Sequence, residues 1–449
     1  MALYKNSLIK LNALFVGSHE LSAIYFKQVG KTTIIKSLSV LISLMYVPLV
    51  LGFIDIEKYG IWVTLTTVVT WIRLLDVGMG NGMRNKLAEA IALKQYQQGR
   101  VYVSTTYGIL GGIFILVLLV FYFVNPFLNW QGILNSALIS PSELVKLTGI
   151  VVSFIVLGFI LQPVTLVYAA HGDSATGGFI QLVISFVSLL LISLVSAFSA
   201  KGNIILLGWV VTGVPVLIYI AVSVYTFLYK YPQLRPSFKL IKISESGNLL
   251  RLSAQFFVVQ ITATILYSSI PFVVAQLFSP NEVTVFNIAN SIFNLPIMLI
   301  SLIVAPVLPL VTQAYANQDY TWIRSMLKKM NMVSLLIVAG TIIMIIISNF
   351  IYHVWIGNKV IIPFNLSVAI GIYTIINVLV TPFSTFINGI GKIRILVMLA
   401  PLGIGMFIGG SILLAKLMGD VVAISIALSL SSVLGLIVVP LELRKYKIL

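Results

Sequence analysis

A stripe of polar and charged residues runs through 59–82, a hydrophobic segment long enough to cross a bilayer. Its members recur every three or four residues and would share one face of a helix: Trp62, Thr66, Thr70, Arg73, Asp76, Gly80 and Arg84. Arg73 and Asp76 can pair at this spacing. Because a charge at the bilayer centre costs about 2.5–3.5 kcal/mol, this face should avoid lipid. It either ties the segment to its neighbours or lines a polar cavity, where Arg73 meets an anionic group and Asp76 exchanges an ion.

Weaker polar stripes occur at helical spacing in four other hydrophobic segments. They comprise Lys36, Ser39, Ser43 and Tyr46; Ser253, Gln260, Thr264 and Tyr267; Asn287, Asn290, Asn294 and Ser301; and Thr374, Asn377, Thr381, Ser384 and Asn388. Each stripe either hydrogen-bonds a neighbouring helix or contributes to a wide hydrophilic lumen. The deep cations outnumber Asp76, the one acid well inside a predicted span. A basic interior favours an anionic substrate such as a phosphate.

The composition excludes an ordinary soluble protein. Of 449 residues 59% are hydrophobic and 9% charged, with a mean hydropathy of +1.08, whereas soluble domains carry about 25% charge. The chain has no cysteine, and its three histidines match no metal-binding motif. We therefore expect no metal, no cofactor and no catalytic residue.

Twelve segments are long and apolar enough to span a bilayer, which needs about 20 helical residues. They are 32–54, 59–82, 101–124, 143–169, 178–200, 204–229, 250–278, 283–311, 331–354, 363–389, 395–415 and 421–441. Charged residues interrupt the apolar segment 8–26, which predicts a short interfacial helix. Prolines inside the spans bend their helices, either simply to allow packing or to suit a transporter that rocks between two states. The span at 283–311 should bend most.

The loop charges predict that both termini are cytoplasmic. Of 28 lysines and arginines, 22 fall in the terminal segments and alternate loops, and 5 fall in the opposite loops. Positive loops stay on the cytoplasmic side. This asymmetry explains the net charge of +16 through contacts with membrane lipids, without nucleic acid as a partner.

These patterns predict an all-α integral membrane protein with about 12 transmembrane helices in two six-helix bundles around a central cavity. Its parts are a cytoplasmic arm (1–31), a first bundle (32–229), a basic cytoplasmic linker (230–249), a second bundle (250–441) and a cytoplasmic tail (442–449).

The run LGFIDIEKYGIWVTLTTVVTWIRLLDVGMGNGMRNKLAEAIA, at 51–92, resembles the second-span region of O-antigen and polysaccharide flippases of the multidrug/oligosaccharidyl-lipid/polysaccharide exporter superfamily. The predicted spans, termini and middle loop are similar to that family along nearly the whole chain. The resemblance implies a bacterial inner-membrane flippase, not an enzyme, for undecaprenyl-diphosphate-linked oligosaccharides of lipopolysaccharide or other polysaccharide biosynthesis. It implies transport from the cytoplasmic to the periplasmic leaflet by alternating access, coupled to protons or sodium, beside a polymerase and chain-length machinery.

On this view the diphosphate would meet cations, the sugars would lie among polar side chains, and Asp76 is the ion-coupling candidate. The candidate cavity residues are Arg73, Asp76, Lys36, Arg84, Thr66, Thr70, Gln260, Tyr267, Asn287, Asn294 and Asn377. Two alternatives remain. The basic interior disfavours a multidrug antiporter of the same superfamily, since organic cations need acids at depth. A membrane polymerase or ligase is disfavoured because the longest outer loop, 125–142, has no Arg, Asp or His.

Overall fold

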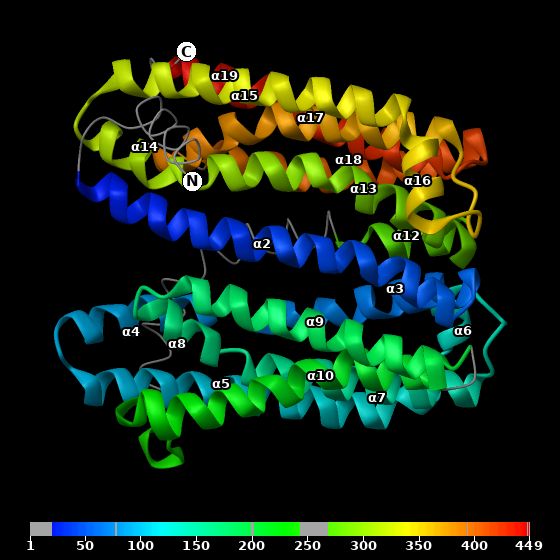
Figure 1. Cartoon of the computed structure of the whole chain (residues 1–449), viewed down its shortest axis with the longest axis horizontal. Coiled ribbons are helices and arrows are strands. Elements are labelled where there is room, and N and C mark those ends of the chain that lie inside the picture. The colour runs from blue at the N-terminus through cyan, green and yellow to red at the C-terminus, as the bar shows by residue number, and fades with distance from the viewer. Residues whose placement is uncertain are drawn as a thin grey trace.

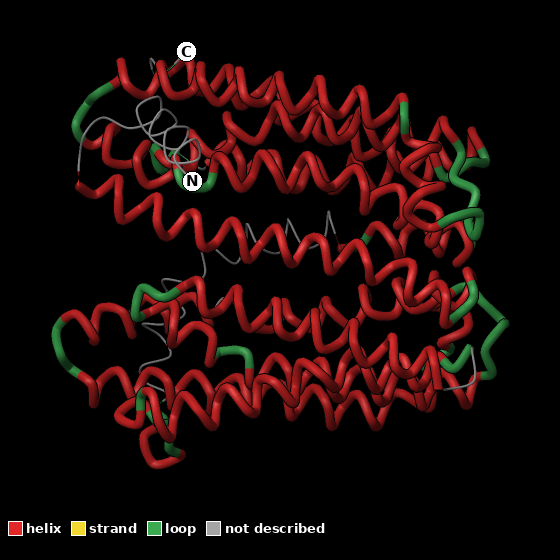
Figure 2. The backbone as a smooth tube through the Cα atoms, in the orientation of Figure 1, coloured by secondary structure: helices red, strands yellow, loops and turns green. Residues whose placement is uncertain are grey.

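The computed structural model describes residues 20–76, 79–198, 202–242, 268–392, 394–446 and 448. Within these ranges the chain is helical and has no β-strand (Figure 2). Nine of the described helical segments are long and apolar enough to cross a membrane. The predicted all-α membrane fold is therefore confirmed, and the chain is a multi-pass membrane protein.

The first half of the chain forms one bundle, drawn at the bottom and middle of Figure 1. Its elements are α2 (Glu20–Phe53), α3 (Ile56–Thr70), a 3₁₀ turn (Trp71–Asp76), α4 (Met79–Ala92), α5 (Tyr96–Val124), a 3₁₀ turn (Asn125–Phe127), α6 (Trp130–Leu134), α7 (Pro141–Leu161), α8 (Val164–Ala170), α9 (Ser174–Phe198) and α10 (Ile204–Tyr225). Helix α2 packs along α9, and α10 packs against α7.

The second half forms the other bundle, at the top of Figure 1. It comprises α12 (Ile270–Leu277), α13 (Pro280–Val304), α14 (Val307–Ala316), α15 (Tyr320–Ile346), α16 (Ser348–Ile356), α17 (Phe364–Gly389), α18 (Arg394–Met418) and α19 (Val422–Lys445). Helix α19 packs between α17 and α18, and α13 packs on both α17 and α3. The α3–α13 contact joins the two bundles.

The chain between the bundles follows α5. A π-helical turn (Thr226–Lys230) ends α10, and short 3₁₀ turns follow at Pro232–Leu234 and Phe238–Leu240. The backbone N–H groups of Ser237 and Lys242 donate to the hydroxyls of Ser104 and Thr105, each at 3.0 Å. This part of the basic linker therefore lies on the first bundle.

Helix boundaries follow local chemistry that the hydropathy scan did not include. Helix α15 starts at Tyr320, ahead of the predicted 331, because Asp319 caps it by accepting from the backbone N–H of Trp322 at 3.0 Å. Hydrogen bonds from the Thr321 hydroxyl and from that N–H lower the pKa of Asp319. Helix α2 starts at Glu20, so residues 20–31 are helical and continuous with the predicted first span, while 1–19 lie outside the described residues.

Prolines interrupt two of the predicted spans. Pro163 separates α7 from α8, and Pro306 separates α13 from α14, since proline lacks the N–H that continues a helix. The span at 283–311 is broken, as expected from its prolines, whereas Pro48 and Pro215 lie inside continuous helices.

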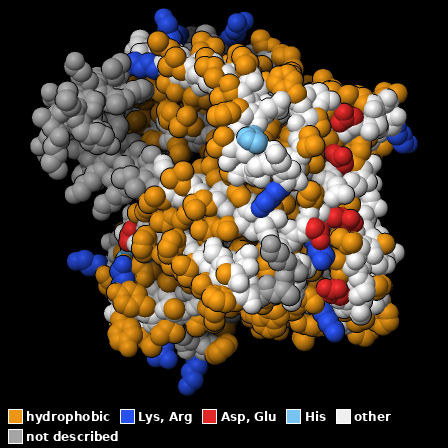
Figure 3. All heavy atoms as spheres, turned by 45° about the vertical axis from the view of Figure 1, so that its right-hand side comes forward, with side chains coloured by type: hydrophobic (Ala, Val, Ile, Leu, Met, Phe, Trp, Pro, Cys, Tyr) orange, Lys and Arg blue, Asp and Glu red, His pale blue; other side chains and the backbone are white. Residues whose placement is uncertain are grey.

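The surface has a hydrophobic belt between two polar ends. Hydrophobic side chains cover the sides of the helices, and Asp and Glu gather at the end that comes forward in Figure 3. We call this the acidic end; its acids are Asp55, Glu57, Glu143, Glu282 and Asp420. The opposite, basic end carries Arg84, Arg100, Lys230, Arg235, Lys392 and Arg444. Helix α3 starts at the acidic end and α4 finishes at the basic end, so the 3₁₀ turn Trp71–Asp76 between them lies midway between the two ends.

A buried asparagine fixes the acidic end of the first bundle. The Asn125 Oδ1 accepts from the Trp130 indole at 2.7 Å and from the Thr148 hydroxyl at 2.9 Å, and its Nδ2 donates to the Val145 carbonyl at 3.0 Å. Leaving buried donors without an acceptor costs about 1–3 kcal/mol each. We expect Asn125→Leu to lower the thermal unfolding midpoint of the purified protein clearly.

The matched control is Asn317→Leu, since Asn317 is exposed at the basic end. If the two variants unfolded at the same temperature, the Asn125 network would have no stabilising role.

Candidate functional site

The two bundles meet at the acidic end, where the hydrogen bonds that cross between their described residues lie. Each has a side-chain donor. They run from Asn135 to the carbonyls of Ala275 (2.8 Å) and Phe278 (3.1 Å), from Gln276 to those of Ile133 (2.8 Å) and Gly132 (3.3 Å), from Thr284 to that of Ile56 (2.7 Å), from Trp355 to that of Leu44 (2.7 Å), and from Asn287 to the Tyr59 hydroxyl (2.9 Å). We call this set the closure.

A glycine allows the closest approach within the closure. A Cβ atom on Gly60 of α3 would overlap the backbone carbonyl of Pro280, the first residue of α13. Because the obstacle would be main chain, a rotamer change could not relieve it. The bundles can therefore meet in this arrangement only if residue 60 has no side chain.

A cavity with both polar and apolar walls lies between the bundles. It has a volume of about 530 Å³, and the polar side chains that line it are Ser39, Ser43, Ser291, Asn294 and Ser301. The first two belong to α2 and the others to α13. This size falls within the roughly 300–1,000 Å³ of sites for drug-sized ligands, and the described residues that line it are all uncharged.

A second polar space lies inside the first bundle, where the predicted second span is interrupted. Instead of one continuous helix, the chain forms α3, the 3₁₀ turn Trp71–Asp76 and then α4. A 3₁₀ turn in the middle of a helix often marks a functional hinge. Two chambers meet here, of about 280 and 100 Å³, and Arg73, Phe159 and Gln162 line both. We call them together the Arg73 cavity.

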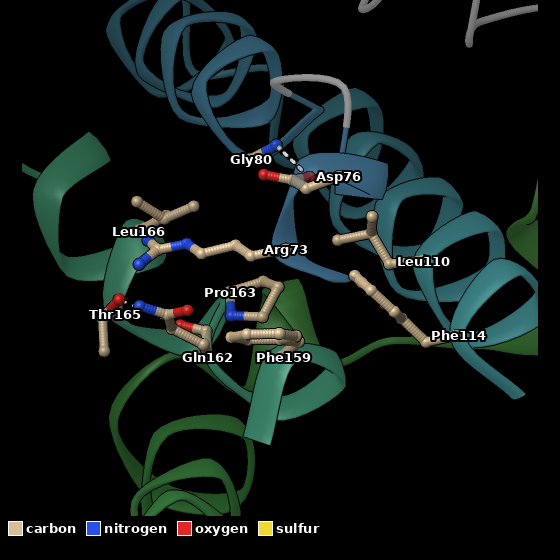
Figure 4. A pocket seen from close by; sticks show the side chains of 10 residues that line it. All are labelled: Arg73, Asp76, Gly80, Leu110, Phe114, Phe159, Gln162, Pro163, Thr165 and Leu166. Carbon is tan, nitrogen blue, oxygen red and sulfur yellow. Dashed lines mark hydrogen bonds between the residues drawn. The ribbon is translucent and has the colours of Figure 1, made fainter. Parts of the chain in front are cut away.

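Arg73 projects into this cavity without forming an ion pair. Its guanidinium extends past Gln162 toward Thr165 and Leu166, as Figure 4 shows, while the Asp76 carboxylate turns to the backbone N–H of Gly80, 3.3 Å away. The expected Arg73–Asp76 ion pair within 4.0 Å is absent among the described salt bridges. The two residues can pair at this spacing, but Asp76 instead accepts a hydrogen bond from the first turn of α4.

The 3₁₀ turn also contacts the other bundle. The ring of Trp71 lies edge-on to that of Phe272 in α12, with centroids 5.4 Å apart. The same turn therefore places Trp71 against the second bundle and Arg73 in the Arg73 cavity. A change at Arg73 can reach α12 through this one turn.

The structure distributes the predicted site residues over several places instead of one lumen. Arg73, Asp76 and Thr66 line the Arg73 cavity, Asn294 lines the cavity between the bundles, and Asn287 belongs to the closure. The remaining described candidates line neither cavity: Thr70 donates to the Thr66 carbonyl (2.6 Å), Asn377 to the Tyr373 carbonyl (2.9 Å), and Arg84 to the Asn85 side chain (3.3 Å). Gln260, Tyr267 and the side chain of Lys36 lie outside the described residues.

Sequence reasoning missed four polar residues that line the larger chamber. They are Gln162 of the α7–α8 break, Gln181 of α9, and Thr212 and Tyr219 of α10. A glutamine inside a hydrophobic span is itself a signal, because an uncharged amide at that depth still needs partners. The search for repeated stripes overlooked these single residues.

The fold occurs in known transporters. A family model described as MatE matches residues 256–413. An inward-facing multidrug resistance MATE family transporter of the MOP superfamily superposes with a TM-score of 0.73 at 13% identity, over 91% of this chain and 95% of that one. The chain has the MATE fold. No curated protein matches its sequence.

Two further structures share the MATE fold. An outward-facing MATE family transporter superposes with a TM-score of 0.67 at 14% identity, over 94% of each chain. The lipid II flippase MurJ, in an inward closed conformation, gives 0.66 at 12% identity, over 92% of this chain and 87% of that one. Proteins described as drug transporters and as a lipid flippase thus share this architecture.

Proposed function

We propose that this protein is an alternating-access transporter that flips undecaprenyl-diphosphate-linked oligosaccharides across the bacterial inner membrane. The observation that carries the proposal is Arg73, a cation midway across the membrane that faces a polar cavity and forms no described ion pair. A cation at that depth favours an anionic group, and a guanidinium suits phosphate oxygens. The MurJ likeness supports the flippase class.

The closure supports a direction of loading. If positive loops stay in the cytoplasm, the basic end is cytoplasmic and the acidic end is periplasmic. The bundles are then sealed toward the periplasm, which corresponds to an inward-facing state that loads from the cytoplasmic leaflet. Opening would require the hydrogen bonds of the closure to break and similar contacts to form at the basic end.

Each part of the lipid-linked unit has a proposed place. The diphosphate is attracted by Arg73, with Arg84 and Lys36 on the approach from the basic end. The sugars lie in the cavity between the bundles, among the serines and Asn294. Asp76 is the candidate for coupling to protons or sodium. A polysaccharide polymerase and its chain-length machinery would receive the product.

A multidrug antiporter is the second candidate. Its support is the set of MATE structures with this fold, two of which are described as multidrug resistance transporters. Against it, the described cavity between the bundles has no acidic lining residue that would attract an organic cation. Asp76, the acid nearest the site, lines the smaller chamber beside Arg73.

The deciding experiment is mass spectrometry of undecaprenyl-linked oligosaccharides from cells without the gene and from complemented cells. A glycosidase that cannot cross the membrane reports the leaflet. We expect complete repeat units to accumulate, protected from the enzyme, only without the gene. Unchanged lipid-linked pools would contradict the flippase proposal, and drug-efflux assays would then test the antiporter.

A further inference from the structure

Four hydrogen-bond donors without a described partner converge on the larger chamber of the Arg73 cavity. They are the Arg73 guanidinium, the side-chain amides of Gln162 and Gln181, and the Tyr219 hydroxyl. None of these groups takes part in a hydrogen bond within the described parts of the chain. An arginine alone carries five N–H donors and no acceptor. The chamber therefore places one donor-only cation beside three groups that can both donate and accept hydrogen bonds.

Two further polar residues of the chamber already use their hydroxyl protons. The hydroxyls of Thr66 and Thr212 donate to carbonyls of their own helices, at 2.9 and 2.6 Å. Much of the remaining wall is apolar, from Phe154, Ile155 and Val211.

The size of the chamber limits the ligand. At about 280 Å³ it is smaller than most sites for drug-sized molecules, which are roughly 300–1,000 Å³. The sugars of a lipid-linked oligosaccharide belong in the larger space between the bundles, whereas a halide or a phosphate ion fits among these donors. The two spaces share no described lining residue.

We propose that the Arg73 cavity binds a small inorganic anion, halide or phosphate, held by Arg73, Gln162, Gln181 and Tyr219. The anion accepts hydrogen bonds from these four groups and neutralises the charge of Arg73 while no substrate is bound. The diphosphate of the proposed function would displace it. Because Trp71 of the same turn contacts Phe272, the bound anion also stabilises the turn that reaches the second bundle.

The test uses the full-length protein purified in detergent, titrated with sodium bromide or sodium phosphate against sodium gluconate at constant ionic strength. We expect a saturable rise in the thermal unfolding midpoint with bromide or phosphate but not with gluconate. Arg73→Gln should weaken this response at least about tenfold, since hydrogen bonds to charged groups contribute about 1.5–3 kcal/mol. Crystals soaked in bromide should show an anomalous peak beside Arg73.

Two further variants guard against a folding defect in Arg73→Gln. Tyr219→Phe and Gln181→Leu keep the positive charge and each remove one donor, so they should weaken anion binding severalfold. The control Arg444→Gln removes an exposed cation at the basic end and should retain the wild-type response.

Three results would overturn the proposal. The first is no response in the wild type, and the second is an equal response in Arg73→Gln and the wild type. The third is stabilisation by geranyl diphosphate alone, without an effect of bromide or inorganic phosphate, because the cavity would then be selective for a lipid headgroup.

Discussion

Gly60→Ala is expected to abolish the closure and leave the protein open at its acidic end. The added methyl would overlap the Pro280 carbonyl, and this backbone atom cannot rotate away. Alanine also favours a helix over glycine by about 0.8–1.0 kcal/mol, so α3 itself should not be weakened. A population shift from mostly closed to mostly open follows, and transport that needs both states should fall at least about tenfold.

The chain has no cysteine, so a pair of introduced cysteines can carry spin labels without removing native residues. Ser142 in the first bundle and Ile361 in the second are exposed near the acidic end. Pulsed electron paramagnetic resonance should give a longer distance in Gly60→Ala than in the parent pair. Gly112→Ala is the control, because a Cβ atom there meets nothing within 4 Å. An unchanged distance in Gly60→Ala would refute the role of this contact.

Arg73→Gln is expected to reduce transport by about 10–100-fold, the equivalent of about 1.4–2.8 kcal/mol. Glutamine keeps much of the length and polarity of the side chain but removes the charge that the proposed diphosphate requires. Arg73→Lys should retain part of the activity, since it keeps the charge but loses the planar fork. The readout is the amount of protected lipid-linked oligosaccharide in complemented cells, normalised to the amount of transporter in the membrane.

The matched substitution Arg444→Gln should transport normally, because this arginine is exposed and distant in sequence from either cavity. Wild-type transport by Arg73→Gln at equal membrane levels would exclude a role of the cation in substrate passage. A loss shared equally by Arg73→Lys and Arg73→Gln would instead indicate that the guanidinium geometry, not the charge, is required.

Hydropathy was sufficient to predict the helical class and the location of most spans, because a bilayer imposes a minimum length on every apolar helix. It could not predict where a helix starts beyond the bilayer. Helix α15 begins at Tyr320 through the Asp319 cap, a local hydrogen bond to which an average over 20 residues is insensitive.

The spacing of polar residues in the second span also indicates where its helix is interrupted. Thr70, Arg73 and Asp76 recur every three residues, which is the period of a 3₁₀ helix, whereas the flanking members of the stripe follow steps of four. Periodicity identifies a shared face but not the neighbour that it contacts. Whether Arg73 faced the space between the bundles or the interior of one bundle therefore depended on tertiary packing.

The closure described above uses main-chain acceptors almost throughout. Asn135, Gln276, Thr284 and Trp355 all donate to backbone carbonyls of the opposite bundle. A carbonyl is present whatever side chain its residue carries, so substitutions at the acceptor positions leave these hydrogen bonds in place. Only the donor of each of these four pairs must keep its side chain. The acceptor side of the closure can therefore accumulate substitutions while the two bundles still meet there.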